Sequence, residues 1–149
     1  MLQKKTKYAI KALLALAKHY GEHRPLKISE ISNNEKIPRK FLEAIMVDLK
    51  KIGYVSSTMG ARGGYVLIKH PEEVMLSNII RSTGGPIALL PCVSLNFYES
   101  CKECVGEDVC GLRDVILEVR EASIKILSKT SLSDILRREN RLFKKFGLQ

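Results

Sequence analysis

The four cysteines of this 149-residue chain all lie in one short stretch, with the spacing C-x8-C-x2-C-x5-C. They are Cys92, Cys101, Cys104 and Cys110. Thiolates are soft ligands that favour iron–sulfur clusters, zinc and copper(I). The CxxC formed by Cys101 and Cys104 lets two sulfur atoms reach one metal centre. The stretch therefore predicts a metal or cluster site in which all four cysteines are candidate ligands.

Two other interpretations of the cysteine stretch stay open. The thiols could form a dithiol redox switch, or they could be buried and chemically inert. In a small secreted domain four cysteines would predict two disulfides, whereas a reducing cytoplasm favours a metal site, a cluster site or a redox switch.

The N-terminal segment favours the cytoplasm. Residues 1–20 begin with positive charge and continue with apolar residues, but they contain no small-residue cleavage site, and charge recurs at Lys11 and Lys18. They predict an amphipathic helix rather than a signal peptide. No apolar run approaches the roughly 20 residues that span a bilayer, so we expect a cytoplasmic protein without a membrane partner.

The net charge of +9 is confined to the first half of the chain. Residues 1–70 hold 14 Lys and Arg against 5 Asp and Glu, whereas residues 71–149 hold 11 of each. An excess of positive charge in one half indicates a polyanionic partner such as nucleic acid. A merely solvated basic surface is the alternative.

The first half also predicts three helices. The first covers residues 2–20, the second begins near its candidate N-cap Ser29, and the third runs from Pro38 to about Ile52 before Gly53 stops it. The third helix has an apolar stripe that we expect to be buried. Its members are Phe41, Leu42, Ile45, Leu49 and Ile52.

Two short strands follow, at residues 54–58 and 65–68, around a glycine-rich turn. Three helices and then a hairpin with a basic tip predict a winged helix-turn-helix, a mainly α fold with a small β-hairpin wing. The third helix would enter the major groove of double-stranded DNA. Winged helices also serve as protein-binding modules, an alternative that the confined positive charge disfavours.

Five residues are candidates for contacting DNA in such a fold. Arg39 and Lys40 begin the third helix and suit phosphates and base edges, and Glu43 suits a cytosine amino group. Arg62, with Gly63 beside it in the turn, would reach a phosphate or the adjacent minor groove. A solvated surface charge is the alternative for each charged residue.

The second half predicts a long helix behind the cysteine stretch. A short helix from Leu76 ends near Gly84, and the long helix runs from about Asp108 to Leu127. Its apolar face is wider than packing on one small domain requires, which favours contact with a second copy of the chain. A simple core helix is the alternative.

After the long helix, Thr130 or Ser131 would cap a short helix over residues 132–136, followed by a basic tail over residues 141–149. The chain then divides into three parts. These are a winged helix-turn-helix domain in residues 1–84, a cysteine-bearing sensor loop in residues 85–110, and a dimerisation helix with a C-terminal tail in residues 111–149.

Several segments resemble the Rrf2 family of bacterial winged-helix regulators, in the family's order and over nearly the whole chain. They are YAIKALL at 8–14, FLE at 41–43, LKKIGYV at 49–55, GARGGY at 60–65, and GGPI at 84–87 leading to a cysteine. The wing and GGPI segments are the most specific. The resemblance implies a transcription regulator, for example a repressor, that binds its operator as a homodimer through the long helix.

The resemblance also implies a [2Fe–2S] or [4Fe–4S] cluster held by three cysteines and one other residue. Cys92 matches the first cysteine and Cys110 the last, while either Cys101 or Cys104 matches the middle one. This chain departs from the family by its extra cysteine, by Arg113 where a histidine is expected, and by having no acidic residue near Tyr8. The resemblance therefore implies a cluster site in this chain, but it leaves open whether the cluster is [2Fe–2S] or [4Fe–4S].

Two functions therefore compete. The first is a dimeric regulator whose operator affinity is set by an iron–sulfur cluster or by thiol redox state. The second is a regulator with a zinc-bound or metal-free cysteine loop, controlled by a small molecule or partner protein. An enzyme is disfavoured, because His19, His23 and His70 are scattered and no phosphate-binding loop or acid/base pair is present.

Overall fold

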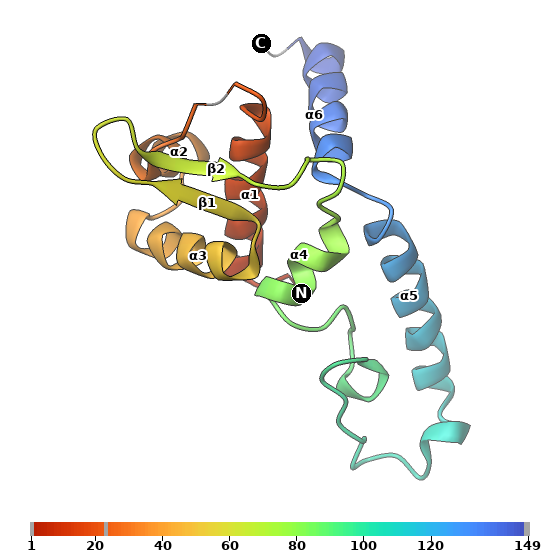
Figure 1. Cartoon of the computed structure of the whole chain (residues 1–149). Helices are drawn as coiled ribbons and strands as arrows, with labels where there is room; N and C mark the ends of the chain where they lie inside the picture. The colour runs from red at the N-terminus through yellow and green to blue at the C-terminus, as the bar shows by residue number, and fades with distance from the viewer. Residues whose placement is uncertain (1, 23, 148–149) are drawn as a thin grey trace.

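The structure is a computed structural model that describes residues 2–22 and 24–147. It is mainly α-helical with one antiparallel hairpin, as the sequence predicted (Figure 1). In chain order the elements are α1 (Lys4–Lys18), α2 (Ile28–Glu35), α3 (Arg39–Ile52), β1 (Val55–Thr58), β2 (Gly64–Leu67), α4 (Leu76–Thr83), the 3-10 turns η1 (Pro91–Val93) and η2 (Glu107–Val109), α5 (Gly111–Leu127) and α6 (Leu132–Phe146). His23 lies outside the described residues.

The winged head, formed by the described part of residues 2–83, is built on α1 and α3. Ala9, Ala12 and Leu13 of α1 are fully buried, and so are Leu42 and Leu49 of α3. Small residues on α1 let the backbones approach, and the removal of apolar surface from water drives the packing. This core holds the start of α3 and the wing in fixed positions.

The predicted buried stripe of α3 is wrong at two positions. Phe41 and Ile52 are 55% and 39% exposed, whereas Met46 is fully buried. Phe41 lies in the first turn, and its ring meets Tyr8 edge-on with centroids 6.3 Å apart. Both residues lie near an end of α3. There the apolar stripe continues beyond the elements that pack against the middle of the helix, so these two side chains remain exposed. Gly53 ends the helix in the left-handed region (φ 84°), as expected.

The predicted N-cap of α2 is also wrong. The helix begins at Ile28, so Lys27 occupies the cap position and Ser29 lies inside the first turn. The Glu30 carboxylate accepts a hydrogen bond from the Lys27 backbone N–H at 2.8 Å. A glutamate at this position satisfies a backbone donor that the helix itself leaves free.

Strand β2 of the wing is paired on both of its edges. β1 and β2 run antiparallel from Val55 opposite Leu67 to Thr58 opposite Gly64. On the other side, Leu26 and Tyr65 exchange two backbone hydrogen bonds of 2.9 and 2.8 Å. The loop between α1 and α2 therefore acts as a third short strand.

The last helix is much longer than predicted. α6 covers 15 residues, and the expected short helix with a basic tail is wrong because the helical pattern continues through that tail to Phe146. Ser131 is the cap, and its hydroxyl accepts from the Asp134 backbone N–H at 3.2 Å. Leu132 is fully buried in the core of the head, and Lys18 of α1 pairs with Glu139 at 3.2 Å.

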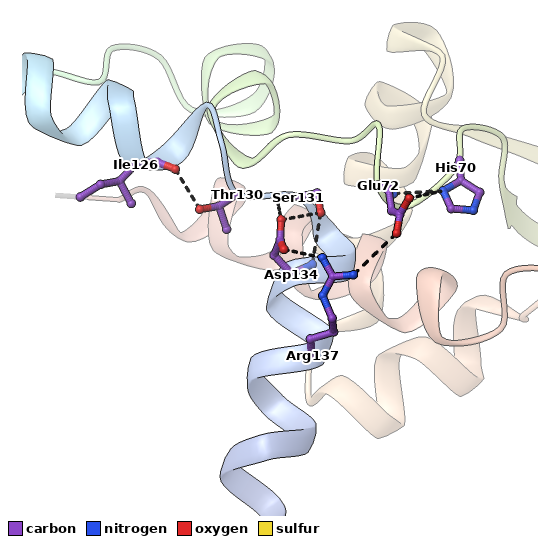
Figure 2. A network of polar contacts seen from close by, with 7 residues as sticks. All are labelled: His70, Glu72, Ile126, Thr130, Ser131, Asp134 and Arg137. Carbon is purple, nitrogen blue, oxygen red and sulfur yellow. Dashed lines mark hydrogen bonds and ion pairs between the residues drawn. The ribbon is translucent and has the colours of Figure 1, made fainter.

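The turn between α5 and α6 is tied to the loop that joins β2 to α4 (Figure 2). Leu76 N–H donates to the Thr130 carbonyl at 2.8 Å. Arg137 reaches Asp134 at 2.6 Å and Glu72 at 3.6 Å. The Ser131 backbone N–H, followed by Arg137, holds the pKa of Asp134 below its ordinary value. The C-terminal end of α5 is thereby attached to the winged head.

No helix in the described part of the chain is long and apolar enough to cross a membrane.

Candidate nucleic-acid interface and cysteine site

The start of α3 presents the three residues that the sequence assigned to it. Pro38 is the N-cap and leaves Arg39 and Lys40 as the first two helical residues. Both are exposed, as is Glu43. Arg39 Nε lies 3.0 Å from Glu43 Oε1, one helical turn away. Since this pair is solvent-exposed and worth little to stability, both side chains are free to exchange partners.

The wing turn separates its two candidate residues. Arg62 is exposed at the tip, whereas Gly63 is buried. A Cβ at Gly63 would lie 2.3 Å from the Thr58 carbonyl oxygen, so no other residue fits without moving the turn. Gly63 shapes the turn that presents Arg62.

The cysteine loop distributes its four thiols unequally. Cys92 lies in η1 and is 7% exposed. Cys101, Cys104 and Cys110 are half-buried near the start of α5. Cys104 Sγ lies 3.8 Å from Cys110 Sγ, and Cys104 also interacts with the Cys101 thiol. The structure therefore brings three thiols together around Cys104, and the polar contacts described for this group do not include Cys92.

Cys110 is also the N-cap of α5. Its sulfur accepts a hydrogen bond from the Arg113 backbone N–H at 3.4 Å. This hydrogen bond, with the contact from Cys104, lowers the pKa of Cys110. Helix N-termini favour negative charge, which is why thiols there ionise easily. Hydrogen bonds with Cys101 and Cys110 raise the pKa of Cys104 to about 12. The pair therefore consists of a thiolate-forming Cys110 and a protonated Cys104.

These opposite pKa shifts predict the order of alkylation in the reduced, metal-free protein. Iodoacetamide reacts with the thiolate, so Cys110 should be labelled first at neutral pH. Cys104 should react only as the pH rises toward its raised pKa. Peptide mass spectrometry over a pH series measures both residues in one sample. Labelling of Cys104 ahead of Cys110 would contradict the arrangement.

Glu107 organises the loop around the thiols, and the sequence analysis missed it. Its carboxylate accepts from the Tyr98 hydroxyl at 2.9 Å and from the Cys101 backbone N–H at 3.4 Å. Its second oxygen lies 3.4 Å from Arg113 Nε. The hydrogen bond to Glu107 raises the pKa of Tyr98. The sequence signal that could have identified Glu107 was the presence of an acidic residue between the CxxC and Cys110.

Arg120 connects the other end of the loop to α5. Its Nη1 donates to the Val93 carbonyl at 2.6 Å, next to Cys92. The Arg120 side chain is 13% exposed and also contacts Glu121. No local sequence pattern marks Arg120, because its partner lies 27 positions away.

The thiols fit an iron–sulfur cluster or zinc by their chemistry, since thiolates are soft ligands and the lowered pKa of Cys110 favours its thiolate form. Among residues 2–22 and 24–147, no group of three or more histidine, cysteine, aspartate or glutamate side chains is already arranged around a metal position. The ligand role of the four cysteines stays a prediction.

α5 has two apolar faces. Half-buried residues such as Ile116, Ile124 and Leu127 face their own chain. A second stripe is exposed. Its members are Leu112 (65%), Val115 (57%), Val119 (41%) and Ile126 (63%). With Ala122, these positions follow the 3-4 spacing of a helix-to-helix seam. All four side chains are exposed in the described part of the chain, and Val119 also borders a pocket that Leu2, Ile80 and Leu89 line.

The comparisons with known proteins agree on one family. The Rrf2 family model, described as an iron-dependent transcriptional regulator, matches residues 2–138. An HTH-type transcriptional regulator of Rhodobacter capsulatus, named rrf2-like, is 41% identical over 138 residues, which cover 91% of this chain and 92% of the relative. The regulator NsrR of Geobacillus kaustophilus is 32% identical over 131 residues, covering 88% and 86%.

Among solved structures, CymR, the global cysteine regulator of Bacillus subtilis, is similar with a TM-score of 0.74 and 27% identity. The similarity covers 91% of this chain and 95% of CymR.

Proposed function

The chain belongs to the Rrf2 family of transcriptional regulators, and we propose that it binds a DNA operator as a homodimer whose affinity follows the chemical state of the loop from Cys92 to Cys110. It is a regulator and not an enzyme, as the sequence predicted. Because the DNA of a bacterial cell lies in the cytoplasm, a protein that binds an operator there acts in the cytoplasm.

The exposed stripe of α5 supports the homodimer. Leaving aliphatic side chains in water costs roughly 25 cal/mol per Å² of apolar surface. When the same stripe on a second copy packs against it, both stripes are removed from water, because a two-fold axis brings the same residues of each chain together. In the dimer the two α5 helices pack along Leu112, Val115, Val119 and Ile126.

Each head then reads one half-site. Arg39 and Lys40 contact phosphates and base edges from the start of α3, and Glu43 accepts from a cytosine amino group. Arg62 contacts the backbone or minor groove from the wing tip, held there by the turn at Gly63. Half-sites about one helical turn apart, ~34 Å, require the two heads to keep one separation.

The cysteine loop controls that separation through α5. Cys110 caps the N-terminal end of α5, while the C-terminal end is attached to the head through Ser131 and Leu132. α5 is about 25 Å long at 1.5 Å per residue and connects the two sites. A change at Cys110 therefore alters how α5 leaves the loop, and this alters the placement of the heads. Arg120 couples the Cys92 end of the loop to the same helix.

An iron–sulfur cluster, when bound, would supply a centre that responds to iron, oxygen or nitric oxide. Cys101, Cys104 and Cys110 would hold it, with Cys92 as the candidate fourth ligand. Without a metal the same thiols form a dithiol switch. A peroxide takes two electrons from the two sulfurs as its O–O bond breaks to water and hydroxide, and Cys104 loses its proton. The Cys110 thiolate and Cys104 then form a disulfide, and the sulfurs approach from 3.8 Å to about 2.05 Å.

The observation that carries this proposal is the position of Cys110, which belongs to the thiol group and is also the cap of α5. The test is operator binding by fluorescence anisotropy, with the operator selected from a random duplex library. Protein purified without oxygen, characterised by visible absorption with iron, sulfide and zinc analysis, is compared with oxidised protein. We expect affinities that differ about 5- to 150-fold. Equal affinities in the two states would exclude control by the loop. A colourless zinc protein that still responds to oxidation would support the dithiol switch.

A further inference from the structure

A groove beside the wing gathers three basic side chains, of which the sequence analysis singled out only Arg62. Arg24 and Lys27, from the loop and cap before α2, line this groove together with Arg62. The remaining lining residues are Pro25, Glu30 and Gly63. We propose that Arg24, Lys27 and Arg62 bind a phosphate of the DNA backbone. This inference rests on the DNA binding of the proposed function and does not depend on thiol control.

The groove has rigid walls. Leu26 and Tyr65 join its two sides through backbone hydrogen bonds of 2.9 and 2.8 Å. Gly64 lies so close that a Cβ there would be 2.6 Å from the Leu26 carbonyl oxygen. The loop with Arg24 therefore keeps its position relative to the wing tip with Arg62. Because the backbone on both sides of the groove is already held in place, less conformational entropy is lost when the groove binds an anion.

The groove lies on the flank of the wing that faces away from α3. α3 packs against β1, whereas Leu26 pairs with β2, so the wing stands between them (Figure 1). The minor groove of B-DNA is about 6 Å wide and has a phosphate backbone along each side. When the wing tip approaches the minor groove, α3 contacts the DNA backbone on one side of that groove. Arg24 and Lys27 then face the DNA backbone on the other side.

Charge in the groove favours an anion but includes one competitor. Arg24 contacts Glu30, whose other carboxylate oxygen accepts from the Lys27 backbone N–H at 2.8 Å. Three cations against one carboxylate leave a positive surplus. Because the Arg24 side chain is 59% exposed, it can exchange Glu30 for a phosphate, and the negative charge of the phosphate then offsets part of that surplus.

The salt dependence of DNA binding tests this proposal. Each phosphate contact adds about 0.9 to the slope of log affinity against log salt. The double variant Arg24→Gln/Lys27→Gln should therefore lower the slope by about 1 and weaken binding at ~0.15 M salt on the order of tenfold. The loss should be equal for the selected operator and for a duplex of shuffled sequence, because a phosphate carries no sequence information.

Two single variants serve as controls. Lys129→Gln removes an exposed charge from the turn before α6 and should leave the slope unchanged. Glu30→Gln removes the competing carboxylate while its amide oxygen can still accept from Lys27 N–H, so it should tighten binding several-fold. Circular dichroism melting of each variant separates loss of contact from loss of fold.

Equal slopes for the folded double variant and Lys129→Gln would overturn the phosphate site. Looser binding by the folded Glu30→Gln variant would overturn it too. Both results are distinguishable from failure of thiol control, which would leave every slope difference in place while making the affinities of reduced and oxidised protein equal.

Discussion

Replacing Cys104 with serine is expected to abolish the difference in operator affinity between the anaerobically purified and oxidised proteins. Serine preserves the size of the side chain, but it neither ligates soft metals well nor forms a disulfide. Because Cys104 is a candidate cluster ligand and its sulfur lies 3.8 Å from that of Cys110, its loss removes both a cluster ligand and one half of the proposed disulfide. The expected 5- to 150-fold ratio should fall to about one. Anisotropy titrations of both states measure it.

Two further variants make this experiment decisive. Glu103→Gln, between the CxxC sulfurs and exposed, perturbs the same loop without removing a thiol and should keep the ratio. Cys92→Ser distinguishes the two arms, since a Cys104–Cys110 disulfide does not need Cys92, whereas a site with four cysteine ligands does. A ratio that survives in Cys104→Ser would refute the central role of this thiol.

Val115→Glu should convert the dimer into a monomer and weaken operator binding on the order of a hundredfold or more. The residue is 57% exposed within the chain and lies in the middle of the stripe that a second copy would cover. A carboxylate buried there against its own symmetry mate leaves two like charges without partners. Losing the link between two half-site contacts removes the 10²- to 10⁴-fold gain of bivalent binding. Sedimentation velocity measures the mass of the variant in solution, and fluorescence anisotropy measures its affinity for the operator.

The matched control is Lys125→Gln, on the charged face of the same helix. It changes the net charge by the same amount as Val115→Glu, and Lys125 is exposed. We expect this variant to remain a dimer with the affinity of the unmodified protein. If Val115→Glu also remains a dimer at the same concentration, the exposed stripe is not the dimer interface.

Local patterns were enough to predict the head of this protein. The helical repeat of α3, the stop at Gly53 and the glycine-rich turn of the wing are set by neighbouring residues, so the winged fold and the exposed positions of Arg39, Lys40 and Arg62 could be predicted. The four clustered cysteines likewise predicted a thiol site, because coordination chemistry depends on residue type and spacing.

The sequence pattern was weakest at the ends of elements. Phe41 belongs to the apolar stripe of α3 by its spacing, yet the neighbours that would cover it are not there, so it stays exposed. The predicted helix over residues 132–136 was too short, because the Ser131 cap and the helix formers that follow it carry α6 to Phe146. Gly63 is required by the turn, because a Cβ there would meet the Thr58 carbonyl, and its contact with DNA stays a prediction.

Only the tertiary structure decided which distant residues meet. The sequence treats the four cysteines alike, whereas the fold gathers Cys101, Cys104 and Cys110 and places Cys92 in η1. Arg120 reaches the Val93 carbonyl, and Arg24 comes to lie beside Arg62, through contacts far apart in the chain. Spacing along the chain determines local conformation and the ligand types available, but packing determines which side chains share a site, because that depends on where whole elements come to rest.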